Sequence, residues 1–165
     1  HDTPRFFHEA GEDADRLRLA TVLQMTLPGS PGLYYGDEIA MAGGEEPGSR
    51  GAFPWHDEGS WDRDQLETVR SLAALRRSHP ALRSGSLEIV SRTEHGITFV
   101  RSDDSDRLLI SLDRREHPEP LTVPIVSKHP EVVWGVGRLT TNTTGPGSVI
   151  DGVAGAVIVS LGSPK

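Results

Sequence analysis

The sequence predicts an α/β fold over residues 1–80, followed by an all-β fold over residues 81–165. Over residues 1–80 a pair of apolar helical patterns flanks a short strand-like run, which is the order of an alternating α/β architecture. After Pro80 the pattern changes to short apolar runs separated by turn residues, as in a small antiparallel β-sandwich. The join is short and contains no linker, so we expect the two regions to pack together.

The first predicted helix runs from about Ala14 to Thr26. Asp13 offers a carboxylate that can cap its first turn, and Pro28 ends it. The apolar residues of this segment leave little polar face, so the helix should be covered more deeply than an ordinary surface helix. Residues 1–12 before it have the composition of a polar loop.

A buried strand is predicted over residues 32–36, where Tyr34 and Tyr35 favour a covered, pleated conformation. The run ends in Asp37 and Glu38, at the position where α/β folds place their chemistry, beyond the carboxyl end of a strand. The alternative is a capped strand end with two solvated acids.

A glycine-rich loop over residues 42–59 follows and contains the run from Arg50 to Trp55. A second helix is expected over residues 62–78, because apolar residues recur there at three- and four-residue spacing. Pro80 disfavours helical geometry in the residue before it, so the helix should end by then.

Six strands are expected over residues 81–165. In one of them Leu108, Ile110 and Leu112 alternate with other residues, as a half-buried antiparallel strand requires. Trp134 lies among valines and is expected in the core of the sandwich. The six expected ranges are 87–90, 96–101, 107–112, 121–126, 132–136 and 154–161.

Composition excludes several classes of partner. With 24 acids against 17 bases the formal charge is −7, which disfavours nucleic acid and permits a neutral ligand such as a sugar. The absence of cysteine excludes disulfides and thiolate metal sites, and the seven histidines are scattered, so no metal and no cofactor is predicted. No apolar run approaches the roughly 20 residues of a membrane span.

Four motifs, in order, resemble glycoside hydrolase family 13, the α-amylase family, and above all its neopullulanase, cyclomaltodextrinase and oligosaccharide α-glucosidase members. The resemblance is strong over residues 1–80, whereas residues 81–165 fit by position and strand pattern. It implies that residues 1–80 are the C-terminal end, the last two βα units, of a catalytic (β/α)8 TIM barrel, and that residues 81–165 are a C-terminal β-sandwich domain. The motifs are His1-Asp2-Thr3-Pro4-Arg5-Phe6, Thr26-Leu27-Pro28-Gly29, Leu33-Tyr34-Tyr35-Gly36-Asp37-Glu38 and Arg50 to Trp55.

The resemblance assigns two residues to the reaction itself. In this family a third carboxylate and a neighbouring histidine bind hydroxyls of the sugar being cleaved; here these would be Asp2, as transition-state stabiliser, and His1. A carboxylate can accept charge-assisted hydrogen bonds from two vicinal hydroxyls, and such contacts strengthen in the transition state. The alternative is a terminal loop in which Asp2 forms a turn.

Further residues are expected around this site. Arg5 and Arg50 are candidate sugar-binding residues, although for Arg50 a loop-packing role stays equally open. Phe53 and Trp55 are expected to plug the long loop against the last helix. Structural support near the site is expected from three further residues, one acid of which would hydrogen-bond Arg5 or loop backbone: Tyr35, Asp37 and Glu38.

The resemblance places the nucleophilic Asp and the acid/base Glu of the family on barrel strands upstream of His1. Asp37 and Glu38 cannot replace them, because adjacent residues of an extended strand point to opposite faces. The predicted function is therefore the C-terminal portion of a retaining α-glycosidase acting on α-glucans or maltooligosaccharides, by hydrolysis or transglycosylation, inactive alone. The alternative is a non-catalytic carbohydrate-binding or assembly module built on residues 81–165.

The predicted partners are an α-glucan or maltooligosaccharide in the full-length enzyme, with no nucleic acid and no membrane. A barrel strand pairs on both edges, so an isolated 32–36 strand would leave unpaired backbone and favour self-association of the fragment. An export signal would precede His1, so localisation stays open and a cytoplasmic one is only weakly favoured.

Overall fold

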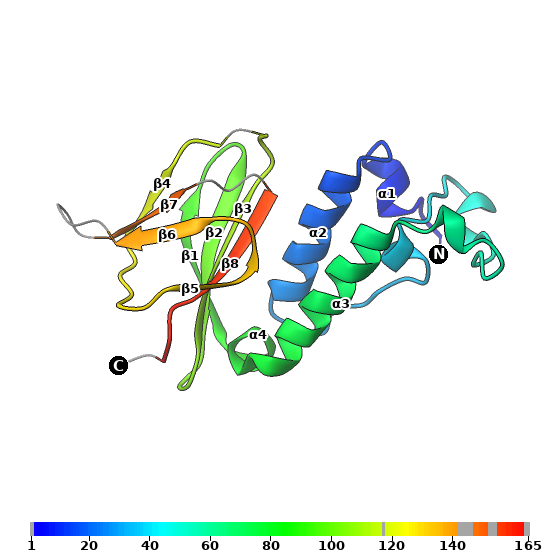
Figure 1. Ribbon diagram of the computed structural model, residues 1–165. Helices are drawn as coiled ribbons and strands as arrows, with labels where there is room; N and C mark the ends of the chain where they lie inside the picture. Colours follow the sequence, from blue (N-terminus) through cyan, green and yellow to red (C-terminus); the bar gives the residue numbers. More distant parts are fainter. Residues whose placement is uncertain (1, 117, 142–146, 152–154, 164–165) are drawn as a thin grey trace.

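A computed structural model describes residues 2–116, 118–141, 147–151 and 155–163, and it shows helices followed by two β-sheets (Figure 1). Within these residues no helix is long and apolar enough to cross a lipid bilayer. Short 3₁₀ helices occupy Asp37–Ile39, Gly48–Arg50 and Glu58–Ser60. The α-helices are α1 (Phe6–Glu9), α2 (Ala14–Thr26), α3 (Arg63–Ser78) and α4 (Pro80–Ser84).

The two long helices form where the sequence predicts them, and each begins at an aspartate. Asp13 accepts hydrogen bonds from the backbone N–H groups of Asp15 and Arg16, at 3.0 and 3.1 Å. Asp62 accepts one from the N–H of Gln65 at 2.8 Å. These carboxylates satisfy donors that have no partner inside the helix. The short helices α1 and α4 were not predicted.

The predicted strand over residues 32–36 is wrong. Residues 32–34 have no regular secondary structure, and a turn at 35–36 leads into the 3₁₀ helix. Leu33 and Tyr35 are 43% and 40% exposed rather than buried. The physical reason is that a strand is stabilised by hydrogen bonds to a neighbouring strand, and before Ser86 the described chain contains no strand with which this segment could pair.

In the part of the chain that the structure describes, eight strands form two antiparallel sheets. All six predicted strands are present, but the one expected over 121–126 ends at Val123, because Pro124 has no N–H to donate. Two strands were not predicted, β6 and β7. The strands are β1 (Ser86–Arg92), β2 (Gly96–Ser102), β3 (Arg107–Asp113), β4 (Leu121–Val123), β5 (Glu131–Gly135), β6 (Arg138–Thr141), β7 (Ser148–Asp151) and β8 (Gly155–Ser160).

The molecule has three layers: the helices, a five-stranded sheet in the order β1-β2-β3-β8-β5, and a three-stranded sheet in the order β4-β7-β6 (Figure 1). The side chains of β8 pack on both neighbouring layers, because successive side chains of a strand point to opposite faces. Ala156 and Ile158 pack with α2, α3 and α4. Val157 and Val159 pack against the second sheet. The large sheet is therefore covered on both faces.

Two arginines donate to carbonyl groups at the carboxyl end of α2, one from the large sheet and one from α3. Arg101 of β2 is fully buried and donates to the carbonyl oxygen of Thr26 and, at 2.9 Å, to that of Gly85. Arg76 of α3 donates to the carbonyl oxygen of Met25 at 2.8 Å. Burial lowers the pKa of both guanidinium groups. Carbonyls at the end of a helix carry partial negative charge, so they suit cations. The expectation that the two regions pack together is confirmed.

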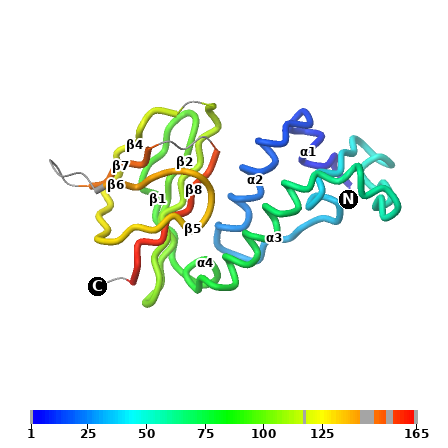
Figure 2. Tube along the Cα trace, viewed as in Figure 1, coloured from blue at the N-terminus to red at the C-terminus, as the bar shows by residue number. Residues whose placement is uncertain are grey.

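The sequence predicted Trp134 in the core of the sandwich, but the residue does not lie between the two sheets. A bulge at Val133 shifts the register of β5, so Val132 pairs with Val159 but Trp134 pairs with Ile158, whose side chain faces the helices. The Trp134 indole N–H donates to the Ser71 hydroxyl of α3 at 2.9 Å. Figure 2 shows how the chain brings β5 back beside β8. The bulge therefore moves this indole from the sandwich core to the junction between helices and sheet.

Candidate functional site

The candidate site lies where the first residues of the chain meet the loop before α3. Asp2 and Arg50, which are 48 residues apart in the chain, form an ion pair at 3.1 Å. The same guanidinium contacts the Glu46 carboxylate at 3.0 Å. The side chains of Asp2 and Arg50 are 72% and 43% exposed, so both have surface that a ligand can reach. His1 lies outside the described residues.

Arg5 holds this region together from within. Its side chain has no exposed surface, and Nη1 donates to the Tyr35 carbonyl at 2.7 Å and to the Asp37 carboxylate at 3.2 Å. The guanidinium carbon also lies 4.5 Å from the centre of the Tyr34 ring and 4.8 Å from that of Tyr35. Such cation–π contacts are stronger when the cation is desolvated. This geometry favours a supporting role for Arg5 over the direct sugar contact expected from the sequence.

Both acids of the Asp37-Glu38 pair have partners. Burial raises the pKa of Asp37, while the Arg5 guanidinium acts in the opposite direction. Glu38 accepts a hydrogen bond from the Gly36 N–H at 2.7 Å. The expected contact of one acid with Arg5 or with loop backbone is present. The two residues lie in a 3₁₀ helix, however, so the argument from opposite faces of a strand does not apply to them.

Three glycines and a tyrosine fix the shape of the loop. Gly36 has φ +90°, and a Cβ there would lie only 2.8 Å from the Met41 sulfur, so a larger residue does not fit. The Tyr35 hydroxyl donates to the Gly51 carbonyl at 2.9 Å. The Arg5 N–H donates to the Gly43 carbonyl, also at 2.9 Å. These bonds fold the loop back onto the segment around Arg5 and thereby place Arg50 beside Asp2.

The aromatic residues of the loop pack differently from the predicted plug. The Phe53 ring lies 4.3 Å from that of Trp55 and 5.5 Å from that of Trp61, measured between ring centres. Trp61, just before α3, donates from its indole to the Pro54 carbonyl at 3.2 Å. Trp55 itself is 70% exposed. The plug prediction is therefore wrong for Trp55, because Trp61 occupies the inner position against Phe53.

This arrangement can bind a polyhydroxylated ligand. The Asp2 carboxylate can accept hydrogen bonds from hydroxyls, and Arg50 beside it can donate. Among the residues that the structure describes, no group of three or more His, Asp or Glu side chains is arranged to hold a metal ion. Glu46 was not predicted from the sequence, where its four-residue spacing from Arg50 was the available signal.

The candidate site lies in a segment of the chain that resembles known proteins. Residues 1–79 match the family described as alpha amylase, catalytic domain. The chain is 32% identical over 142 residues to a cyclomaltodextrinase of Geobacillus thermopakistaniensis, covering 85% of this chain and 24% of that protein. It is 31% identical over 145 residues to a maltogenic alpha-amylase of Bacillus acidopullulyticus, covering 84% and 25%.

A solved structure has the same arrangement of elements. The debranching enzyme of Nostoc punctiforme superposes with a TM-score of 0.84 and 28% sequence identity, over 97% of this chain and 34% of that one. The chain spans about a quarter of the length of the two curated relatives that it matches. The chain therefore belongs to the alpha-amylase family, and its residues 1–79 correspond to a portion of the catalytic domain.

Proposed function

We propose that this chain forms the C-terminal portion of a retaining α-glycosidase that acts on α-glucans or maltooligosaccharides. In this proposal residues 1–80 complete a (β/α)8 catalytic barrel, and residues 81–165 form its C-terminal β-sandwich domain. The names of the relatives, a cyclomaltodextrinase and a maltogenic alpha-amylase, support this substrate class. The observation that carries the proposal is the exposed ion pair of Asp2 and Arg50, formed within a segment that matches the catalytic domain.

Asp2 acts on the sugar ring at which the bond is cleaved. Its carboxylate accepts hydrogen bonds from two neighbouring hydroxyls, and these contacts become stronger as the ring distorts towards the oxocarbenium-like transition state. Arg50, 3.1 Å away, holds the carboxylate in place and donates to the same sugar. His1 beside Asp2 is the second hydroxyl ligand that the family resemblance implies. Stabilising the transition state more than the bound substrate raises kcat.

The 165 residues alone do not cleave glycosidic bonds. A retaining mechanism needs a nucleophile and an acid/base about 5 Å apart across the scissile bond. Asp37 is bound by Arg5, and Glu38 by the Gly36 backbone, so neither acid is placed to serve. In this proposal the two reacting carboxyl groups are contributed by the rest of the barrel, and Arg5, Tyr35 and Asp37 hold the loop that carries Arg50.

A chimera tests this proposal. Residues 1–165 replace the matching stretch of the Geobacillus cyclomaltodextrinase, and hydrolysis of cyclomaltohexaose is measured beside the 165-residue chain alone. The chimera should release reducing sugar at an enzymatic rate, and the chain alone should release none above background. An inactive chimera that folds, as judged by circular dichroism and thermal denaturation, would contradict the proposal. Ordinary enzymatic turnover by the isolated chain would do so as well.

A further inference from the structure

A hollow separate from the candidate site lies between α2 and the end of the five-stranded sheet, and none of the candidate-site residues lines it. Its volume is about 430 Å³, within the range of roughly 300–1,000 Å³ that is usual for small-molecule sites. Leu19 and Val22 of α2 form one wall, and Trp134 and Val136 form another. The site is therefore a cleft with apolar walls at the junction between the helices and the large sheet.

The aromatic wall is held in position by the fold. The bulge in β5 turns Trp134 towards the helices, and its indole N–H is fixed to Ser71 at 2.9 Å. Gly135, the next residue, has φ +81°, and a Cβ there would lie 2.2 Å from the Ala156 carbonyl oxygen. Only glycine allows β5 to approach β8 so closely beside the indole. A rigid aromatic wall loses little conformational entropy on binding.

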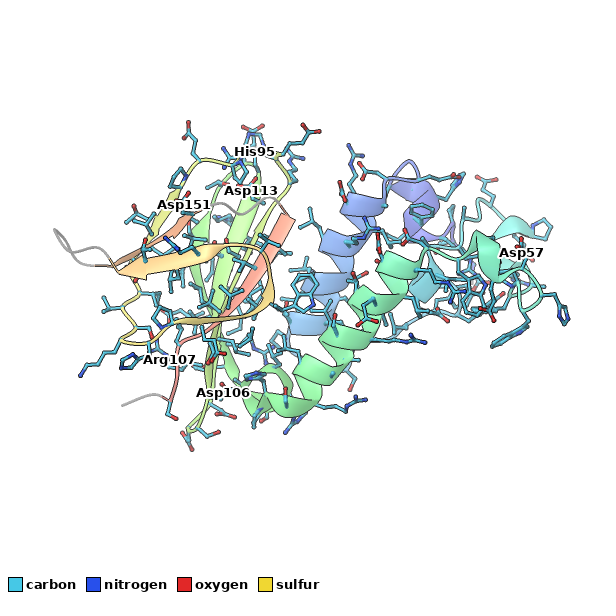
Figure 3. All side chains as sticks on the ribbon, in the orientation of Figure 1. Asp57, His95, Asp106, Arg107, Asp113 and Asp151 are labelled. Carbon is cyan, nitrogen blue, oxygen red and sulfur yellow. The ribbon has the colours of Figure 1, made fainter. Side chains whose placement is uncertain are left out.

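The rim of the cleft is polar and has no net charge. Arg18 donates to Asp62 at 3.2 Å, and Arg115 binds Asp113 through two nitrogens, at 3.0 and 2.7 Å. These hydrogen bonds from Arg115 lower the pKa of Asp113. Figure 3 shows Asp113 at the end of the large sheet. The rim carries three acids and three arginines, Asp15, Asp113, Glu116, Arg18, Arg114 and Arg115.

We propose that this cleft binds a glucosyl segment of an α-glucan outside the catalytic barrel, with Trp134 as the stacking surface. The balanced rim favours a neutral ligand over an anion or a cation. A sugar ring presents apolar C–H faces to an indole and hydroxyls to charged donors and acceptors. The choice of α-glucan, rather than another neutral polyol, rests on the proposed function. A ligand in this cleft contacts both α2 and the sheet, so it anchors the substrate chain at the junction.

Titration of the 165-residue chain with maltoheptaose tests the site, by isothermal calorimetry and by tryptophan fluorescence. We expect saturable binding in the millimolar range or tighter. Trp134→Ala should weaken it by roughly tenfold or more, as truncation of a buried aromatic anchor does. Trp55→Ala is the matched control, because Trp55 is 70% exposed and lies in the loop before α3, away from the cleft; it should leave the affinity unchanged.

A second variant is needed because Trp134 also packs on α3, so Trp134→Ala could weaken binding by disturbing the fold. Val136 is 79% exposed at the rim, so Val136→Asp should preserve the fold and still weaken binding by placing a charge against the apolar sugar face. Absence of saturable binding, equal binding of cellohexaose, or binding that neither variant reduces would overturn the proposal. Such a failure would leave activity of the chimera intact, whereas an inactive chimera with normal binding would count against the catalytic proposal alone.

Discussion

The helical region and the β region of this molecule obtain their order in different ways. In the β region every described strand pairs with another strand, and the large sheet is covered on both faces. In the helical region, residues 32–36 have no neighbouring strand and depend on the buried cation of Arg5 and on the hydroxyl of Tyr35. The β region is thus ordered by pairing between strands, whereas residues 32–36 are ordered by side-chain contacts from Arg5 and Tyr35.

Removal of a core side chain shared by both regions should have the largest effect. Phe99 of β2 is fully buried and packs in the cluster that joins the helices to the large sheet. Phe99→Ala should lower the free energy of unfolding by about 3–5 kcal/mol, through lost burial and a cavity. Urea denaturation measures this. Ile89→Ala, at a residue that is 54% exposed, is the control; comparable losses in both variants would refute the assignment of this core.

Arg101 should be the next most important residue for the junction. Arg101→Met leaves the carbonyl groups of Thr26 and Gly85 without their donor, and hydrogen bonds from a charged group to buried acceptors contribute roughly 1.5–3 kcal/mol. The free energy of unfolding should fall by about that amount. Hydrogen exchange at the end of α2 should accelerate at the same time. Arg92→Met, on the exposed end of β1, should do neither.

Self-association should arise from the helical region rather than from the sandwich. Phe6 and Leu33 are 50% and 43% exposed, and exposed apolar side chains favour association between molecules. Sedimentation velocity should show concentration-dependent dimers or larger species, and Leu33→Lys should reduce them. Val132→Lys on β5 provides the comparison, because Val132 is 39% exposed. If Val132→Lys reduced the assemblies and Leu33→Lys did not, the surface of self-association would lie on the β region, against this prediction.

The smallest effect concerns acid stability of the β region. Hydrogen bonds from Arg115 hold the pKa of Asp113 below its usual range. Because the folded pKa is depressed, the stabilisation is present above the unfolded value, near about 3.9, and is lost as pH falls through the folded pKa. Asp113→Asn should therefore lower the melting temperature slightly at pH 7 and flatten its decline in acid. If the melting temperature of this variant declined in acid as steeply as that of the parent chain, the Asp113–Arg115 pair would contribute nothing to acid stability.

Sequence reasoning succeeded where the deciding interactions are local. Asp13 was expected to cap the first long helix and does so, and apolar spacing predicted the second within one residue of its first residue, Arg63. It failed over residues 32–36, since tyrosine-rich propensity cannot make a strand without a partner. It also misplaced Trp134, because a one-residue bulge reverses the face of every side chain beyond it.

At the candidate site, too, local motifs were predicted correctly and long-range contacts were not all foreseen. The family motif predicted Asp2, and the structure adds its contact with Arg50. A contact of Arg5 with one of the two acids was expected, but the complete burial of the Arg5 side chain beside Tyr35, 30 residues away, was not.

The central claim, that Asp2 binds sugar hydroxyls in the transition state, is tested most directly by the kinetics of Asp2→Asn in the chimera. Asp57→Asn, at an exposed loop acid labelled in Figure 3, is the matched control. The account predicts that Asp2→Asn lowers kcat by about a hundredfold or more, since transition-state contacts worth several kcal/mol are lost. Asp57→Asn should leave kcat unchanged. A kcat for Asp2→Asn within a factor of about two of the parent chimera would contradict it.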